Sequence, residues 1–171
     1  MTPHKSIWQR ITSYPWSRQV CLQRFPWLLS IKAPFSPRLF GQPMTRREIG
    51  LCGELLAARW LRKNQRKILY RNHRGPRRGE VDIVARHGTV LTFVEVKTRT
   101  SSTYGRPADA VNRAKQRLIE RGAQDWLRLL GKPRISFRFD IVEVLLVPEQ
   151  PPHFHIVENA FTLSDSTLTG R

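Results

Sequence analysis

Residues 80–98 constrain the fold most strongly, because polar and apolar residues alternate on both sides of a turn. The runs EVDIVAR and TVLTFVEVKT, joined near His87-Gly88, predict a two-stranded antiparallel hairpin. A two-residue turn at His87-Gly88 places Arg86 opposite Thr89. Because side chains alternate between the two faces of a sheet, one face of this hairpin is almost wholly apolar, and we expect it to pack a core.

The second face of the hairpin becomes charged at the end far from the turn. The side chains that share it are Glu80, Asp82, Val84, Leu91, Phe93, Glu95 and Lys97. In this register Asp82 and Glu95 are diagonal neighbours, with Cβ atoms about 6–8 Å apart. A divalent cation can bridge two such carboxylates, and the Lys97 ammonium would lie beside it, which suits phosphodiester hydrolysis. The alternative is a solvated sheet face of paired charges, and the spacing alone leaves both open.

Around the hairpin, the sequence predicts two helices and three more strands. Apolar residues recur at helical spacing in 48–63, and a second helix, 108–130, ends at Lys132-Pro133. The other strands are expected at 67–72, 134–147 and 153–159. The resulting order, α-β-β-β-α-β-β, indicates an α/β or α+β protein with a mixed sheet.

Residues 1–46 differ in composition from the rest of the chain. They hold seven basic residues, no acidic residue and six prolines, which leave little room for long helices. We therefore expect a basic, irregular N-terminal extension, a folded domain at 47–161 and a tail at 162–171. The extension lacks the apolar region of a secretory signal, whereas a transit peptide would fit its acid-poor composition. Translation from Met44 is a further alternative, because Met44 lies just before the ordered pattern begins.

Charge and composition restrict the function. The 171 residues include 30 Lys and Arg against 13 Asp and Glu, a formal net charge of +17. Two cysteines are too few for a disulfide framework or a four-cysteine zinc site, and no apolar stretch approaches the roughly 18 residues of a membrane span. We expect a cytoplasmic protein without stable membrane insertion that binds a polyanion, most simply nucleic acid. The alternatives are an anionic membrane surface and ribosomal RNA bound for assembly alone.

Seven stretches of residues 47–161 resemble, in order, those of the YraN-type family of predicted endonucleases, which is similar to the PD-(D/E)xK nucleases. The stretches are Gly50-x-x-Gly53-Glu54, Arg71-Asn72-x-Arg74, Gly79-Glu80-x-Asp82, Phe93–Arg99, Lys115, Arg138–Val142 and Glu158–Phe161. The resemblance implies a restriction-endonuclease-like fold, in which helices flank a mixed sheet, similar to archaeal Holliday junction resolvases. Residues 1–46 have no counterpart in this pattern.

The resemblance also implies roles for individual residues. Asp82 and Glu95 would be ligands of Mg²⁺ or Mn²⁺, and Lys97 would be the catalytic lysine. Glu54, in the first helix, would be an additional acidic ligand, direct or through water; its alternative is an exposed helix carboxylate. Glu80 would orient a water molecule, or pair with Arg78 or Lys97.

A basic segment precedes the candidate site. Residues 59–78 hold nine basic side chains and no acidic one, which is usually a solvated face but at this position predicts a rim that contacts phosphates. The candidate nucleic-acid-binding residues are Arg71, Arg74, Arg77 and Arg78, with Arg99 and Lys115 on the other side of the site.

These features lead us to expect a metal-dependent endonuclease that hydrolyses DNA, with branched or flapped DNA as candidate substrates. The alternative is a nuclease-like fold that binds nucleic acid without cutting it, which explains the charge equally well. Symmetric cutting of two strands, as a resolvase requires, would need a two-fold homodimer.

Overall fold

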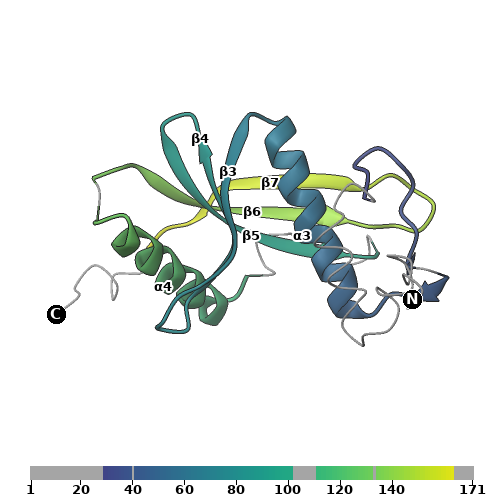
Figure 1. The fold of residues 1–171 in the computed structure, drawn as a ribbon, viewed down its shortest axis with the longest axis horizontal. Helices are drawn as coiled ribbons and strands as arrows, with labels where there is room; N and C mark the ends of the chain where they lie inside the picture. Colours follow the sequence, from purple (N-terminus) through teal and green to yellow (C-terminus); the bar gives the residue numbers. More distant parts are fainter. Residues whose placement is uncertain (1–28, 40, 102–110, 133, 164–171) are drawn as a thin grey trace, which may run out of the picture.

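The computed structural model describes residues 29–39, 41–101, 111–132 and 134–163, and its centre is a five-stranded mixed sheet (Figure 1). The strands lie in chain order: β3 (Arg66–Arg74), β4 (Glu80–His87), β5 (Val90–Arg99), β6 (Phe137–Leu145) and β7 (His153–Phe161). β5 and β6 are parallel, and the other neighbours are antiparallel. The domain follows the predicted order, α-β-β-β-α-β-β, so a mixed α/β protein is confirmed.

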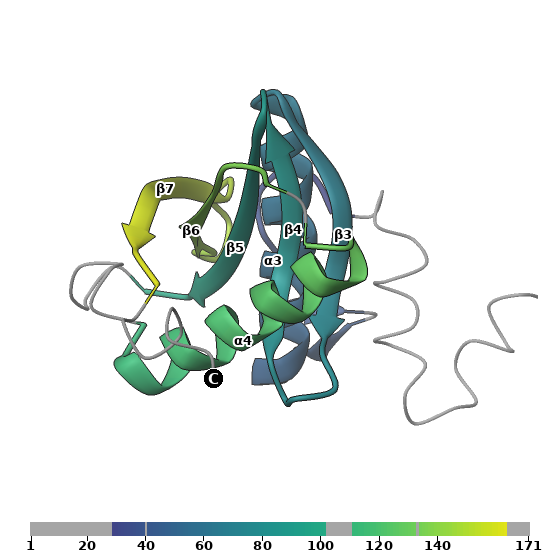
Figure 2. The same ribbon diagram turned by 90° about the vertical axis from the view of Figure 1, so that its left-hand side faces the viewer.

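Helices cover both faces of this sheet. α3 (Arg46–Lys63) packs on the face that carries Ile83 and Val94, and α4 (Arg113–Leu129) packs on the face that carries Phe93. Figure 2 shows α3 and α4 on opposite sides of β3 and β4. α4 also lies in the crossover connection that the parallel pair of β5 and β6 requires. Within the described ranges, no helix is long and apolar enough to cross a membrane.

The first turn of α3 is a capping box. The Thr45 hydroxyl accepts a hydrogen bond from the Glu48 N–H (3.3 Å), and the Glu48 carboxylate accepts one from the Thr45 N–H (2.7 Å). The helix therefore begins two residues before its predicted start, and it ends where predicted. Gly53 brings α3 directly onto β5, because a Cβ there would overlap the Thr98 side chain. This close approach holds the next residue, Glu54, beside the sheet.

The hairpin of β4 and β5 turns one residue later than predicted. His87 pairs with Val90, so the turn consists of Gly88 and Thr89, and the predicted register was wrong. Gly88 has a φ of 58°, which costs glycine nothing, and a two-residue hairpin turn favours glycine in its first position. The pairing shifts by two residues along β5, so every side chain keeps its predicted face.

α4 begins later than predicted, because Asn112 caps it. The Asn112 side chain accepts a hydrogen bond from the Lys115 N–H (2.9 Å), and residues 108–110 of the predicted helix lie outside the described residues. Two glycines bring α4 onto the start of β4: a Cβ at Gly79 would overlap the backbone of Gly122. This contact brings α4 close to the charged end of the hairpin.

Part of the N-terminal extension packs on the domain. Phe35 is only 6% exposed and joins the core under α3. Its N–H donates to the Gln150 carbonyl (2.8 Å), and its carbonyl accepts from the Glu149 N–H (2.9 Å). A short ladder of β1 (Arg38–Leu39) and β2 (Gln42–Pro43) follows. The sequence pattern did not reveal this docking, because one buried aromatic residue in a proline-rich segment has no periodic signal.

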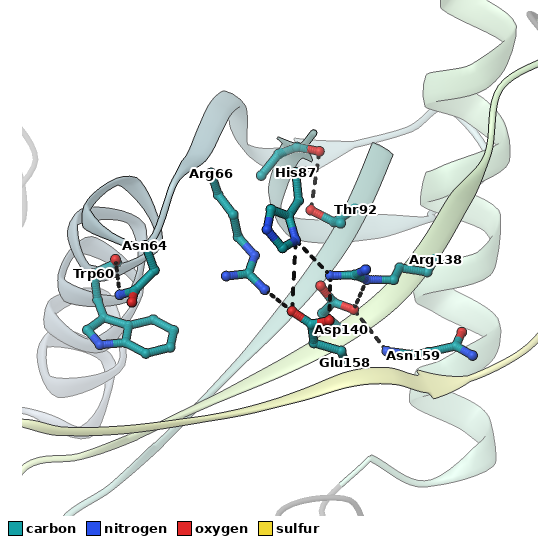
Figure 3. A network of polar contacts seen from close by, with 10 residues as sticks. Trp60, Asn64, Arg66, His87, Thr92, Arg138, Asp140, Glu158 and Asn159 are labelled. Carbon is teal, nitrogen blue, oxygen red and sulfur yellow. Dashed lines mark hydrogen bonds and ion pairs between the residues drawn. The ribbon is translucent and has the colours of Figure 1, made fainter. Parts of the chain in front are cut away.

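A polar network joins the two edge strands of the sheet (Figure 3). Arg66 on β3 forms an ion pair with Glu158 on β7, and Arg138 contacts the same carboxylate at 3.0 Å. Asp140 is fully buried and accepts hydrogen bonds from Arg138 (2.9 Å) and from the Asn159 N–H (3.0 Å). Since β3 and β7 are the outer strands, the Arg66–Glu158 contact means that the sheet curls strongly at this end.

Candidate active site

The candidate site lies where the pairing of β4 and β5 stops. Backbone pairing extends to Ile83 and Val94, and Asp82 and Glu95 are the next residues beyond this last pair, so the register that made them diagonal neighbours was wrong. Asp82 Oδ2 accepts a hydrogen bond from the Val96 N–H at 2.8 Å. The Asp82 side chain therefore occupies the Val96 N–H, which would bond to the β4 backbone if the ladder continued. We call Glu54, Glu80, Asp82 and Glu95 the carboxylate cluster.

Glu95 is the most enclosed member of the cluster, with a side chain only 3% exposed. Its Oε1 lies 2.9 Å from Lys97 Nζ and 3.3 Å from Lys115 Nζ. Its Oε2 is buried and has no hydrogen-bond partner in the part of the chain that the structure describes. The prediction that Glu95 and Lys97 share a face is confirmed, and an acceptor atom is left over in the site.

Asp82 is protonated more readily than an ordinary aspartate. Burial raises its pKa from 3.8 to about 8, and the negative charges of Glu95 and Glu54 add to the rise. The hydrogen bond from the Val96 N–H and the charge of Lys115 act in the opposite direction. Crowded carboxylates of this kind are relieved by a proton or by a cation.

Glu54 reaches the cluster from α3, on the other side of the sheet from α4. Burial raises its pKa, a hydrogen bond with Asn72 and the charge of Arg71 lower it, and Glu95 raises it again. The structure therefore places Glu54 within electrostatic reach of Glu95 and contradicts the alternative of a solvated helix residue. The sequence offered no internal signal for this position, which came only from the family resemblance.

Lys115 is the residue whose place the sequence reasoning missed. It was predicted at the phosphate-contacting rim, but its ammonium lies among the carboxylates, 2.5 Å from Glu80 Oε1 and 3.3 Å from Glu95 Oε1. The hydrogen bond from Lys115 holds the pKa of Glu80 below its ordinary value. No pattern in the hairpin indicates where a helix some 20 residues later brings its side chains.

The remaining basic candidates are divided between the cluster and other contacts. Arg71 is within electrostatic reach of Glu54, and Arg74, which is 81% exposed, lies 3.6 Å from Glu80. Arg77 instead pairs with Asp125 at 2.9 Å, and Arg78 is exposed in the loop after β3.

Arg99 pairs with Glu143 of β6 at 2.7 Å. It also lines a groove of about 420 Å³ between the start of α3 and the end of β5, together with Arg46 and Thr98. This groove opens on the α3 side, one residue beyond Lys97 in the chain. Its basic lining extends the positive surface away from the β3 loop.

The donor chemistry of the cluster fits Mg²⁺ or Mn²⁺, which prefer carboxylate oxygens, and the partnerless Glu95 Oε2 is such an oxygen. The side chains as they stand do not converge on one point: across the described ranges, no three His, Cys, Asp or Glu residues gather closely enough to hold an ion. Ammonium groups of Lys97 and Lys115 lie there instead. A cation would therefore require these side chains to rearrange.

The fold and the site define a mixed α/β protein in which carboxylates and lysines lie close together where the pairing of β4 and β5 stops. The chain belongs to the uncharacterised protein family UPF0102, whose sequence model matches residues 53–144. A UPF0102 protein of Geobacter sulfurreducens is 43% identical over 116 residues, 68% of this chain and 90% of the relative. One of Alkaliphilus metalliredigens is 38% identical over 115 residues, 67% of this chain and 98% of the relative.

Proposed function

We propose that this protein is a metal-dependent endonuclease of the PD-(D/E)xK class that hydrolyses phosphodiester bonds in DNA. One observation carries the proposal: the buried Glu95, with one oxygen that has no hydrogen-bond partner among the described residues, lies near both Asp82 and Lys97 where the β4–β5 ladder stops. Such a site has the acidic and basic groups that phosphodiester hydrolysis uses, on one face of one hairpin.

The topology supports a restriction-endonuclease-like fold as part of this proposal. Three antiparallel strands in sequence, β3 to β5, are followed by the crossover helix α4 and the parallel strand β6. This order was predicted from the sequence pattern, and the family resemblance implies a mixed sheet flanked by helices. It brings Asp82 on β4 and Glu95 on β5 next to each other, while α3 and α4 each add one side chain from opposite layers.

Each residue has a distinct task in the proposed reaction. Asp82, Glu95 and Glu54 would hold Mg²⁺ or Mn²⁺, which when bound would polarise the scissile phosphate. Lys97, kept in place by its ion pair with Glu95, would orient the attacking water molecule or stabilise the negative charge that develops on the phosphate. Arg74 and Arg78, both exposed, would contact neighbouring phosphates.

A second candidate function is a non-catalytic module that binds nucleic acid on a nuclease-like fold. The specific observation in its favour is that Lys97 and Lys115 both contact the Glu95 carboxylate and offset its negative charge. In such a module the carboxylates would be structural, and DNA binding would show little dependence on metal. Replacing Glu95 by Gln would then strengthen DNA binding, because it removes a negative charge from a basic surface.

The deciding experiment is a cleavage assay with Mg²⁺ or Mn²⁺ on duplex, flap and four-way-junction DNA. We expect wild type to cut at least one of these, and Asp82→Ala and Glu95→Gln to lose cleavage by roughly 100-fold or more, in the range seen for removal of a key catalytic group. Glu149→Gln, which removes one exposed carboxylate from a loop, is the matched control and should cleave normally. An Asp82→Ala variant as active as wild type would refute the proposal.

A further inference from the structure

We propose that Lys115 is the internal counter-cation of this site, and that a divalent cation occupies the carboxylate cluster only by displacing the Lys115 ammonium. The inference rests on the proposed function, because it concerns how the cation of that reaction gains its ligands. It places Lys115 at the carboxylate cluster until a cation displaces it, and only then at the phosphate-contacting rim where it was predicted.

The contacts of Lys115 show which carboxylates a divalent cation would have to share with its ammonium group. Its Nζ bridges two carboxylates, with Glu80 Oε1 at 2.5 Å and Glu95 Oε1 at 3.3 Å. Lys97 Nζ lies 2.9 Å from the same Glu95 oxygen, so two ammonium groups contact Oε1 while Oε2 has no partner among the described residues. An ion that bound both Glu95 and Asp82 would stand next to these positive charges and repel them, strongly so in a partly buried site.

Lys115 can leave the cluster by rotation of its side chain alone. It lies in the first turn of α4, reaches the cluster only with its flexible stem, and its side chain is 23% exposed. The Asn112 cap holds its backbone N–H, so the helix start need not change when the side chain rotates outward. Once displaced, the ammonium would be available to a DNA phosphate, so cation binding and DNA binding would favour each other.

The first test measures cation affinity without DNA. Mn²⁺ is titrated calorimetrically into wild type, Lys115→Met and Lys67→Met, the last a control that removes an exposed positive charge from the far end of β3. We expect Lys115→Met to bind Mn²⁺ roughly tenfold tighter or more, because a like charge has been removed from the site, and Lys67→Met to match wild type. Equal or weaker binding by Lys115→Met, equal tightening by Lys67→Met, or no uptake by any of them would overturn the inference.

A second test uses wild type alone, so it holds even if Lys115→Met fails to fold. Lysines are acylated briefly with and without Mg²⁺, and the modified positions are quantified by mass spectrometry. Displacement predicts that Mg²⁺ raises the reactivity of Lys115 several-fold relative to that of Lys67. Unchanged Lys115 reactivity at saturating Mg²⁺ would contradict it.

The two tests separate this inference from the proposed function. Tighter Mn²⁺ binding by Lys115→Met, with no DNA cleavage by any variant, would leave the counter-cation role standing and remove the nuclease. Cleavage by wild type, with Lys115 affinity and reactivity both unaffected, would support the nuclease and overturn the counter-cation role.

Discussion

At the scale of single residues, the site depends on how Asp82 is held. Its carboxylate accepts a hydrogen bond from the Val96 N–H, and the charge of Glu95 acts on it. Burial and the charge of Glu95 together raise its pKa from 3.8 to about 8. The folded protein therefore binds a proton at Asp82 over a pH range in which the unfolded chain has lost it.

This difference predicts a pH dependence of stability. Since the pKa of Asp82 is raised on folding, its contribution to the free energy of unfolding is fully present below pH 3.8. This contribution is lost as the pH rises through about 8. We expect the free energy of unfolding of wild type to carry a component that falls across this window, and Asp82→Asn, which keeps an acceptor for Val96, to remove it. Urea unfolding at several pH values checks this, with Glu149→Gln as control. Parallel pH profiles for Asp82→Asn and wild type would contradict it.

At the scale of elements, two glycine contacts place the helices that complete the site. Gly53 sets α3 against β5 and so brings Glu54 to the cluster, and the Gly79–Gly122 contact sets α4 against β4. These are backbone-to-backbone or backbone-to-side-chain approaches that no larger residue allows. The site is thus assembled by helix placement as much as by the hairpin itself.

Gly79→Ala should therefore be costly. The added Cβ would overlap the backbone of Gly122, and overpacking of this kind costs about 1–3 kcal/mol of folding free energy. Gly50→Ala is the control in α3, because nothing lies within 4 Å of a Cβ there, and removing a helical glycine stabilises by up to about 1 kcal/mol. Urea unfolding of both variants compares them, and equal stability would show that α4 does not rest on β4 as described.

The same elements show what a sequence can and cannot predict here. The alternation of polar and apolar residues correctly predicted which side chains share each face of the hairpin. The helical spacing of apolar residues predicted α3 to within two residues. The register was wrong because a one-residue change in the turn depends on the φ of Gly88, which alternation does not report. The positions of Glu54 and Lys115 depend on packing between distant segments, so no local pattern could predict them.

At the scale of the whole molecule, the net positive charge is the feature that most restricts what the protein can bind. A net charge of +17 coexists with the carboxylate cluster, and the basic loop after β3 lies next to that cluster. A protein that only bound phosphates would bind more strongly without those carboxylates. Their presence beside exposed arginines is why we propose a reaction centre within a polyanion-binding surface.

The charge predicts a steep salt dependence of DNA affinity. If about six phosphates are neutralised, affinity should fall by roughly a thousandfold between about 50 and 200 mM salt. Arg74→Ala should reduce the slope of log affinity against log salt by about one, whereas Arg86→Ala, near the turn of the hairpin, should leave it unchanged. Fluorescence anisotropy with labelled DNA in Ca²⁺ checks this, and identical slopes for both variants would exclude Arg74 from the interface.

The most direct measurement of the central claim compares wild type with Lys97→Met in one Mg²⁺-dependent cleavage assay, with Mn²⁺ calorimetry on both proteins. Lys97 is assigned to the reaction itself rather than to holding the cation. We therefore predict that Lys97→Met still binds Mn²⁺ but cleaves DNA at least about 100-fold more slowly than wild type. This is the loss expected when one charge-stabilising group is removed. Equal cleavage by both proteins, or no cleavage by wild type on any of the three DNA forms, would contradict the account.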